Sequence, residues 1–383
     1  MRSISRKTAA LASGAVIAVG GITAGIIAAT SGSGETAAQS AAATAKAEMA
    51  AHAAKIAAEP LRLVSITPGA DARAANGAAG VTVTYNKPLP DSAAMPTLQP
   101  AIAGSWKRQG DAVVFAPTAG YPAGTKVTVT AVAVQDKNTD STATSTFTTG
   151  KYSTLRLQEI LAQLGYLPLT WTPAPGGSVP GDNAQAQAAA AYDPPAGTFS
   201  WQSGYPSSLH SLWSQGSDNV VDTGALTGFE AAHGLTITEK LSKAVWASLL
   251  KAAAANDRNT SGYSYAIANQ HLPETLTIWH NGRERLTTPA NTGISVSPTE
   301  AGTFPVYLKM PFQIMSGTNP DGSHYADPVQ WVSYFNGGDA VHYFPRGGYG
   351  WNQSLGCVEL PWSNSETAYH LLPYGTLVTV TGE

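Results

Sequence analysis

Cysteine is nearly absent from this chain, since only one of its 383 residues, Cys357, is a cysteine. A lone thiol cannot close an internal disulfide, so no disulfide framework holds the fold together. Such a thiol is either a small buried hydrophobe or a group kept for chemistry. A zinc site there would need two more ligands, and the nearest candidates, His324 and His370, form no ligand pair at the short spacings that zinc sites favour.

Charge is also scarce. Charged residues make up 12% of the sequence, against roughly 25% in an ordinary soluble protein, and 22 basic against 25 acidic residues leave a formal charge of −3. No cluster of lysine or arginine follows the first few positions. The chain therefore lacks the clustered positive charge that binds a phosphate backbone, and nucleic acid is excluded as a partner. Glycine (38) and proline (25) are plentiful. This composition favours extracytoplasmic β-rich domains joined by loops, and the length favours about two to four of them.

The chain begins with basic residues among its first seven positions, followed by an uncharged stretch from Thr8 to Thr30. That stretch is about long enough to cross a bilayer as a helix, and the preceding positive charges direct the rest of the chain outward. We therefore predict an export signal over residues 1–34, either a cleaved signal peptide or a signal anchor. The protein is expected in the cell envelope, at the cell wall or the outer face of the cytoplasmic membrane, with membrane contact only through this segment.

Two further segments precede the first helical pattern. Residues 35–60 are alanine-rich and stop at Pro60, which predicts a solvated helix or a stiff spacer with too few large apolar residues to bury. Residues 61–150 run in alternating β-type stretches such as "VTVTYNKPL" and "TKVTVTAVAVQD", separated by Gly, Pro and Asn turns. Short strands at this spacing predict an all-β sandwich of the Ig-like type. No cluster of His, Asp or Glu marks a site in it, which favours a spacer role.

In residues 151–258 the spacing of the apolar residues becomes that of helices. The apolar residues of "STLRLQEILAQL" share one face of a helix that stops at Gly165, and two more helices follow after residue 222. The "LGY" and "HGL" corners of this segment resemble the three-helix peptidoglycan-binding module of bacterial cell-wall enzymes. An insertion at 169–222, rich in Pro, Gly and Trp, interrupts the resemblance. The module is therefore expected either to bind the wall polymer through its glycan or to serve packing alone.

Residues 259–383 return to a β pattern that contains Cys357 and, fifteen positions earlier, His342. Within it the Asn-Gly pair of "HNGR" predicts a hairpin. A nucleophilic cysteine needs a base or cation that holds it as a thiolate, access for a substrate carbonyl, and amide donors for the oxyanion. His342, on the predicted strand "DAVHYFP", supplies the base. Gly356 allows a tight turn that points backbone amides at a reacting carbonyl.

Three stretches of this region, "SPTEAGTF", "VHYFPRGGYGWNQSLGCVEL" and the closing "YGTLVTVTG", carry a resemblance to a known family. They resemble the mainly β L,D-transpeptidase (YkuD-type) catalytic domain, in which a His is followed after a dozen or so residues by Ser/Thr-x-Gly-Cys. The resemblance covers about residues 262–383. Together with the export signal, the sandwich and the helices, it is similar to an actinobacterial cell-envelope member of the family.

The resemblance implies a role for each residue of the motif. Cys357 would be the nucleophile and His342 its base, Ser354 and Gly356 would shape the loop and the oxyanion site, and the Tyr343 carbonyl would orient His342. The implied reaction is acyl transfer on peptidoglycan stem peptides: the sulfur attacks the carbonyl of the diamino acid before a terminal D-alanine, D-alanine leaves, and a side-chain amine of a neighbouring stem takes the acyl group. No metal or other cofactor is implied, and carbapenems are expected to acylate the same sulfur.

Other residues depart from the family pattern, or are candidates for the substrate groove. The family often has a second His where this chain has Leu355, Arg or Asn where it has Glu359, and Gly where it has Tyr343. These departures keep open a non-catalytic wall-binding scaffold, and water as acceptor would give an L,D-carboxypeptidase instead. Tyr325 and Trp331 are candidates for lining the substrate groove, although core packing is the more frequent role of aromatic residues in strands.

Overall fold

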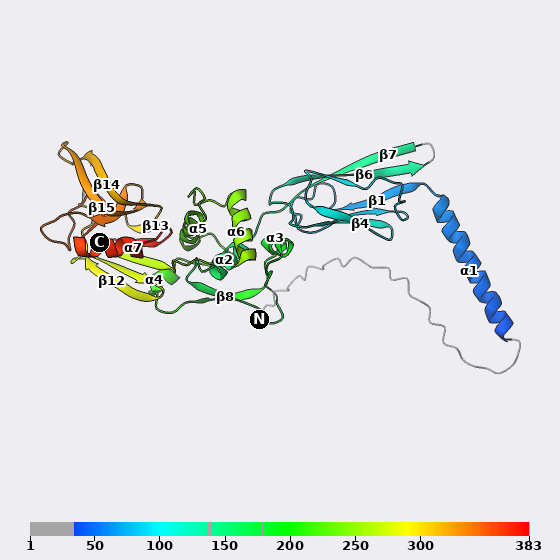
Figure 1. The fold of residues 1–383 in the computed structure, drawn as a ribbon, viewed down its shortest axis with the longest axis horizontal. Helices are drawn as coiled ribbons and strands as arrows, with labels where there is room; N and C mark the ends of the chain where they lie inside the picture. Colours follow the sequence, from blue (N-terminus) through cyan, green and yellow to red (C-terminus); the bar gives the residue numbers. More distant parts are fainter. Residues whose placement is uncertain (1–33, 137–138, 178, 383) are drawn as a thin grey trace, which may run out of the picture. The chain divides into compact units, whose positions relative to one another are not determined.

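The computed structural model describes residues 34–136, 139–177 and 179–382. The chain divides into two units, Met1–Glu59 and Pro60–Glu383. The first contains helix α1 (Gly34–Ala58), whose described side chains are exposed (Figure 1). The predicted export segment lies outside the described residues except for Gly34. Of the helices in the described part of the chain, none is both long and apolar enough to span a membrane.

The second unit starts with a β region, residues 61–150, in which seven described strands pair in the order β3-β6-β1-β2-β5-β4, with β7 also paired to β6. Alternate residues of β2 and β5, among them Val81, Val83 and Val113, are buried and form its core. The strands are β1 (Leu61–Thr67), β2 (Val81–Tyr85), β3 (Thr97–Gln99), β4 (Gly104–Gln109), β5 (Ala112–Pro117), β6 (Lys126–Asp136) and β7 (Thr139–Thr148).

A helical region, residues 151–258, follows. Its helix α2 ends before Gly165, which has a positive φ of 80° as the predicted stop requires. The insertion forms a small two-stranded sheet and two short helices. The elements are α2 (Thr154–Gln163), β8 (Leu169–Pro173), α3 (Ala184–Tyr192), β9 (Gly197–Trp201), α4 (Ser207–His210), α5 (Val220–Ala232) and α6 (Lys243–Ala255).

The helical region shares a hydrophobic core with the C-terminal region, residues 259–383. Tyr263, Tyr265 and Leu377 of the C-terminal region belong to the same buried cluster as the apolar face of α2. Helix α5 passes so close to the segment before β18 that a Cβ atom on Gly224 would lie 2.6 Å from the carbonyl oxygen of Gly375. Only glycine permits this approach, so Gly224 allows α5 to pack against the segment that leads into β18.

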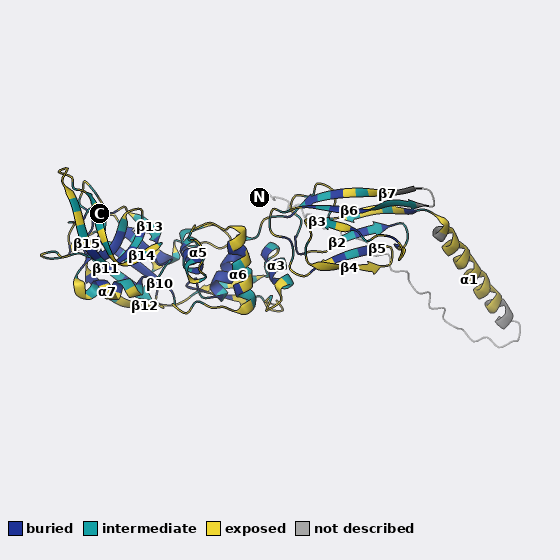
Figure 2. Ribbon diagram, turned by 45° about the horizontal axis from the view of Figure 1, so that its top comes forward, coloured by how far each residue is buried: buried dark blue, intermediate teal, exposed yellow. Residues whose placement is uncertain are grey.

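The C-terminal region contains two sheets and one helix, and buried residues gather on its strands (Figure 2). The first sheet has the order β12-β11-β10-β18-β13 and the second the order β14-β15-β16-β17. The predicted hairpin is confirmed, because His280 pairs with Arg283 across Asn281 and Gly282, both at positive φ. The elements are β10 (Ser264–Asn269), β11 (Thr275–His280), β12 (Arg283–Pro289), β13 (Gly302–Pro305), β14 (Leu308–Thr318), β15 (His324–Asn336), β16 (Asp339–Tyr343), β17 (Val358–Leu360), α7 (Trp362–Leu371) and β18 (Leu377–Thr381).

Candidate active site

The two residues of the motif are positioned by two neighbouring parallel strands. His342 lies on β16, and Cys357 directly precedes β17, whose Glu359 pairs with His342 in the sheet register. Val341 and Val358, which flank the two residues, are buried in the core and hold the strands in place. The fold thus brings residues fifteen positions apart to one edge of the second sheet.

The His342 side chain is buried and has a defined tautomer. Its Nδ1 atom lies 2.9 Å from the carbonyl oxygen of Tyr343. Because a carbonyl only accepts hydrogen bonds, Nδ1 carries the proton and Nε2 is left as the basic nitrogen. Burial lowers the pKa of His342 below its ordinary value of 6.5. The imidazole is therefore neutral, and able to accept a proton, at neutral pH.

The turn before Cys357 is held by its own hydrogen bonds. The Ser354 hydroxyl donates to the Cys357 carbonyl oxygen at 2.5 Å and accepts the Gly356 backbone N–H at 3.2 Å. Gly356 adopts a φ of 117°, which side-chain-bearing residues rarely take. The expected loop-shaping residues therefore meet at this turn, and the Gly356 N–H is already engaged by Ser354.

The Cys357 thiol is half-buried and strongly disfavours ionisation. Burial, followed by the negative charges of Asp339 and Glu359, raises its pKa to about 12, although the backbone N–H of Ala340 favours the thiolate. The sulfur lies 3.8 Å from the carbonyl oxygen of Gly338. The free site therefore contains a neutral thiol.

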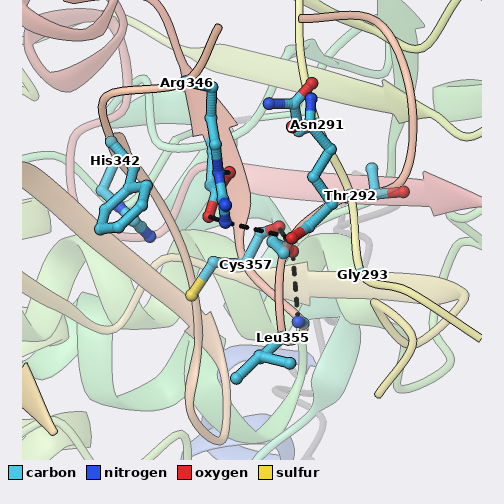
Figure 3. A network of polar contacts seen from close by, with 12 residues as sticks. Asn291, Thr292, Gly293, His342, Arg346, Leu355 and Cys357 are labelled. Atoms are coloured by element: carbon cyan, nitrogen blue, oxygen red, sulfur yellow. Dashed lines mark hydrogen bonds and ion pairs between the residues drawn. The ribbon is translucent and has the colours of Figure 1, made fainter. Parts of the chain in front are cut away.

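Because the Cys357 thiol and the His342 imidazole are both neutral in the free site, the thiol proton has to move during the reaction. Among the described residues, the structure gives no hydrogen bond between His342 and Cys357, although both side chains line one groove (Figure 3). Catalytic hydrogen bonds are often long in a free enzyme and shorten in the substrate complex. The geometry therefore suits transfer of the thiol proton to Nε2 during attack, with His342 as a general base.

The groove has a volume of about 780 Å³ and opens along the β14–β15 hairpin. Tyr325 and Leu355 line it together with Cys357. Trp331 does not: it lies in a bulge of β15 at a φ of 61°, with its ring 5.5 Å from that of Tyr369 and 6.1 Å from that of His370 on α7. The structure thus brings Tyr325 to the site and places Trp331 elsewhere.

Glu359, one of the residues that depart from the family pattern, forms an ion pair beside the reacting groups. Its carboxylate accepts two hydrogen bonds of 2.7 Å from Arg346, whose guanidinium also donates to the Gln353 carbonyl oxygen at 3.0 Å. Figure 3 shows Arg346 at this site together with His342 and Cys357. The pair spans the loop between β16 and β17, so it fixes the path of the chain that ends in Cys357. Arg346 was not predicted from the sequence, although its charge, opposite to that of Glu359 in the same motif, was a usable signal.

A second support lies beneath the same loop. The buried carboxylate of Glu274 accepts the Thr292 backbone N–H at 2.6 Å and the Thr292 hydroxyl at 2.8 Å. Asn291 pairs with Glu359 through two backbone hydrogen bonds, and its side chain accepts the Gly350 N–H. These contacts tie the loop to the first sheet and restrict its movement around the site.

Removing one partner of the Arg346–Glu359 pair is expected to destabilise the C-terminal region. Arg346→Met leaves the Glu359 carboxylate, whose side chain is 5% exposed, without a counter-charge, and the free energy of unfolding is expected to fall by about 3 kcal/mol. Calorimetric unfolding measures this change. The double variant Arg346→Met/Glu359→Met should recover most of the loss, because no buried charge is then unpaired. Equal stability of wild type and single variant would contradict the assignment.

Comparison with known proteins adds one family match. The model of the YkuD family, the L,D-transpeptidase catalytic domain, matches residues 264–380. This range starts at β10 and ends one residue before the end of β18, so it covers both sheets and the groove. No curated protein matches the sequence.

Solved structures give weaker similarities. An L,D-transpeptidase from Mycobacterium smegmatis is 15% identical, with 85% of this chain and 100% of that chain covered and a TM-score of 0.29. L,D-transpeptidase 3 from Mycobacterium tuberculosis, with a faropenem-derived adduct, is 16% identical over 84% and 98% of the two chains, with a TM-score of 0.29. The catalytic domain of the E. faecium L,D-transpeptidase is 27% identical over 30% and 95%, with a TM-score of 0.28.

Proposed function

Residues 264–380 are an L,D-transpeptidase catalytic domain of the YkuD family, and on this premise we propose that the chain cross-links or remodels peptidoglycan by acyl transfer through Cys357. The donor is a tetrapeptide stem that ends in D-alanine, and the acceptor is the side-chain amine of a neighbouring stem. The observation that carries the proposal is the pairing of β16 with β17, which presents His342 and Cys357 to one groove.

In the first half of the reaction, Cys357 attacks the carbonyl carbon of the diamino acid that precedes D-alanine. His342 Nε2 takes the thiol proton as the C–S bond forms, because its Nδ1 is occupied by the Tyr343 carbonyl. The same proton then passes to the nitrogen of D-alanine, the C–N bond breaks, and a thioester remains on Cys357. His342 is neutral again at the end of this half-reaction.

The oxyanion of the tetrahedral intermediate is proposed to lie against the turn at 355–357. The Gly356 N–H donates to Ser354, so the Cys357 N–H is the donor of this turn that we assign to the oxyanion. Backbone amides fixed before the reaction stabilise such a charge without reorganising. The hydrogen bonds of Ser354 are the means by which the turn is fixed.

A turnover assay tests the proposal. Purified disaccharide-tetrapeptide is incubated with the protein, and products are separated and weighed by mass spectrometry. The expected product is a dimer that has lost one D-alanine. A tripeptide alone would identify an L,D-carboxypeptidase, and unchanged substrate, together with no mass increase of the intact protein in the presence of a carbapenem, would leave the scaffold role.

The setting of the reaction is proposed from the remaining parts of the chain. The basic start and uncharged stretch of residues 1–34 support export to the cell envelope, where peptidoglycan lies outside the cytoplasmic membrane. The helical region is proposed to bind the glycan, as its "LGY" and "HGL" corners suggest. Sedimentation of the protein with purified cell walls, compared between the full chain and an otherwise identical chain with the "LGY" and "HGL" corners substituted, measures that contribution.

A further inference from the structure

One carboxylate beside the nucleophile has no role in the chemistry described so far. Asp339 begins β16, three residues before His342, and lines the groove together with Cys357. It packs directly on the turn that carries the nucleophile, because a Cβ atom on Gly356 would lie 2.5 Å from Asp339 Oδ1. The charge of Asp339 is one of the two that oppose ionisation of the Cys357 thiol.

Two of the other acids that line the groove have partners in the structure. Glu359 is paired with Arg346, and Asp321 accepts both the N–H and the hydroxyl of Ser323. Asp339 accepts a backbone N–H from Glu300. Within the described part of the chain, no lysine or arginine forms an ion pair with Asp339. The free site therefore holds a half-buried carboxylate without a cation, next to the sulfur.

Such an arrangement is unfavourable until a cation enters the groove. A partly desolvated carboxylate costs free energy unless it is paired, and here it also raises the barrier to forming a sulfur anion. Four carboxylates, those of Asp321, Asp327, Asp339 and Glu359, face one guanidinium, that of Arg346, around the groove. The field in the groove thus attracts a positively charged ligand.

We propose that Asp339 binds the ammonium group of the acyl acceptor beside the Cys357 thioester and takes the first of the two protons that the nitrogen must lose. This inference rests on the proposed function and names the residue that would favour an amine over water as acceptor. Asp339 is then a catalytic residue of the second half-reaction only.

The ammonium gives one proton to the Asp339 carboxylate, and the resulting neutral amine attacks the thioester carbonyl carbon. A C–N bond forms, the amine's second proton passes to His342 Nε2, and the C–S bond breaks. The proton on His342 then goes to the departing sulfur, which restores the thiol, and protonated Asp339 releases its proton to water. Burial raises the pKa of Asp339 to about 6, closer to neutral pH than an ordinary aspartate and so better suited to accept a proton there.

The test compares aminolysis with hydrolysis of the same acyl-enzyme. Wild type and Asp339→Asn are given one tetrapeptide donor and increasing concentrations of an amine acceptor, and cross-linked and hydrolysed products are quantified. At subsaturating acceptor, Asp339→Asn is expected to lower the ratio of cross-linked to hydrolysed product about tenfold, the loss expected for one charge-assisted contact. Acylation by a carbapenem, which needs no acceptor, should not slow, because the variant removes a charge that opposes the sulfur anion.

A matched control and a second variant keep the result interpretable. Glu366→Gln removes an exposed charge on α7, outside the residues that line the groove, and its product ratio should equal that of wild type. Asp339→Ser, which keeps a hydrogen-bond acceptor without charge, should behave like Asp339→Asn. An unchanged ratio in both Asp339 variants overturns the inference while leaving the proposed function intact. No acyl-enzyme in the wild type overturns both.

Discussion

Cys357→Ala is expected to abolish D-alanine release and cross-link formation, with a loss of at least about 10⁴-fold in rate. The reason is that every step of the proposed reaction forms, breaks or depends on a bond to this sulfur. Loss of a nucleophile in a covalent mechanism removes nearly all of the rate acceleration that the residues acting with it supply. The rate is measured as D-alanine released from the tetrapeptide donor, by mass spectrometry.

Two further measurements separate lost chemistry from lost structure. The Cys357 side chain is half-buried and its truncation removes a single atom, so the unfolding midpoint of Cys357→Ala should stay close to that of wild type. The intact-mass increase with a carbapenem should vanish in the variant. An adduct that persists on Cys357→Ala would place the nucleophile on another residue and would refute the assignment of Cys357.

The chemical pair at the site was predictable from the sequence, whereas its electrostatics was not. His342, Cys357 and the glycine before the cysteine lie within one short motif, and a motif reports the residue types that a reaction needs. The charge state of the thiol depends first on its burial and then on Asp339 and Glu359, which approach it through the pairing of β16 with β17. Spacing in the sequence does not reveal burial or such distances, so the neutral state of the thiol in the free site could not be predicted from the motif.

The position of Trp331 outside the groove has a specific physical cause. Tyr325, Asp327 and Val329 alternate along β15 and line the groove, and the two-residue period of a strand would put Trp331 on the same face. A bulge between Gln330 and Ser333 breaks that period, and Trp331 turns toward α7. One extra residue in a strand shifts every later side chain to the other face. Nothing in "PVQWVSY" marks the bulge, since it has no glycine at the position with positive φ.

The elements that local patterns specify strongly were easier to predict. The Asn-Gly turn between β11 and β12, the glycine that ends α2 and the alanine-rich helix α1 each depend on residues a few positions apart. The close contact of α5 with the segment before β18 joins Gly224 to Gly375, which are far apart in the sequence. This contact cannot be predicted from the sequence, because a glycine at either position is compatible with many local structures.

His342→Gln is expected to lower the rate of Cys357 acylation by about 10² to 10⁴-fold, the usual contribution of a general base. Glutamine has nearly the length of histidine and can still donate to the Tyr343 carbonyl, but it cannot take the thiol proton. The thiol, with its pKa raised to about 12, does not ionise unaided near neutral pH. The matched control is His370→Gln, because His370 lies on α7 against Trp331, outside the residues that line the groove, and it should keep the wild-type rate.

The pH profile identifies how His342 acts. Burial lowers the pKa of His342 below 6.5, and only the neutral imidazole accepts a proton. Acylation of wild type by a carbapenem should therefore rise as pH increases through a value below 6.5 and then stay level through neutral pH. The rise should disappear in His342→Gln, whose residual rate instead increases toward alkaline pH with the small thiolate fraction. Asp339, whose pKa is raised to about 6, gains its charge in the same pH range and opposes the sulfur anion, so the profile is also recorded for Asp339→Asn, in which the rise should remain. Two results would contradict this role: a rise in the acylation rate centred above pH 6.5 in wild type, or the same rise below pH 6.5 in His342→Gln. Either result would mean that a group other than His342 accepts the thiol proton.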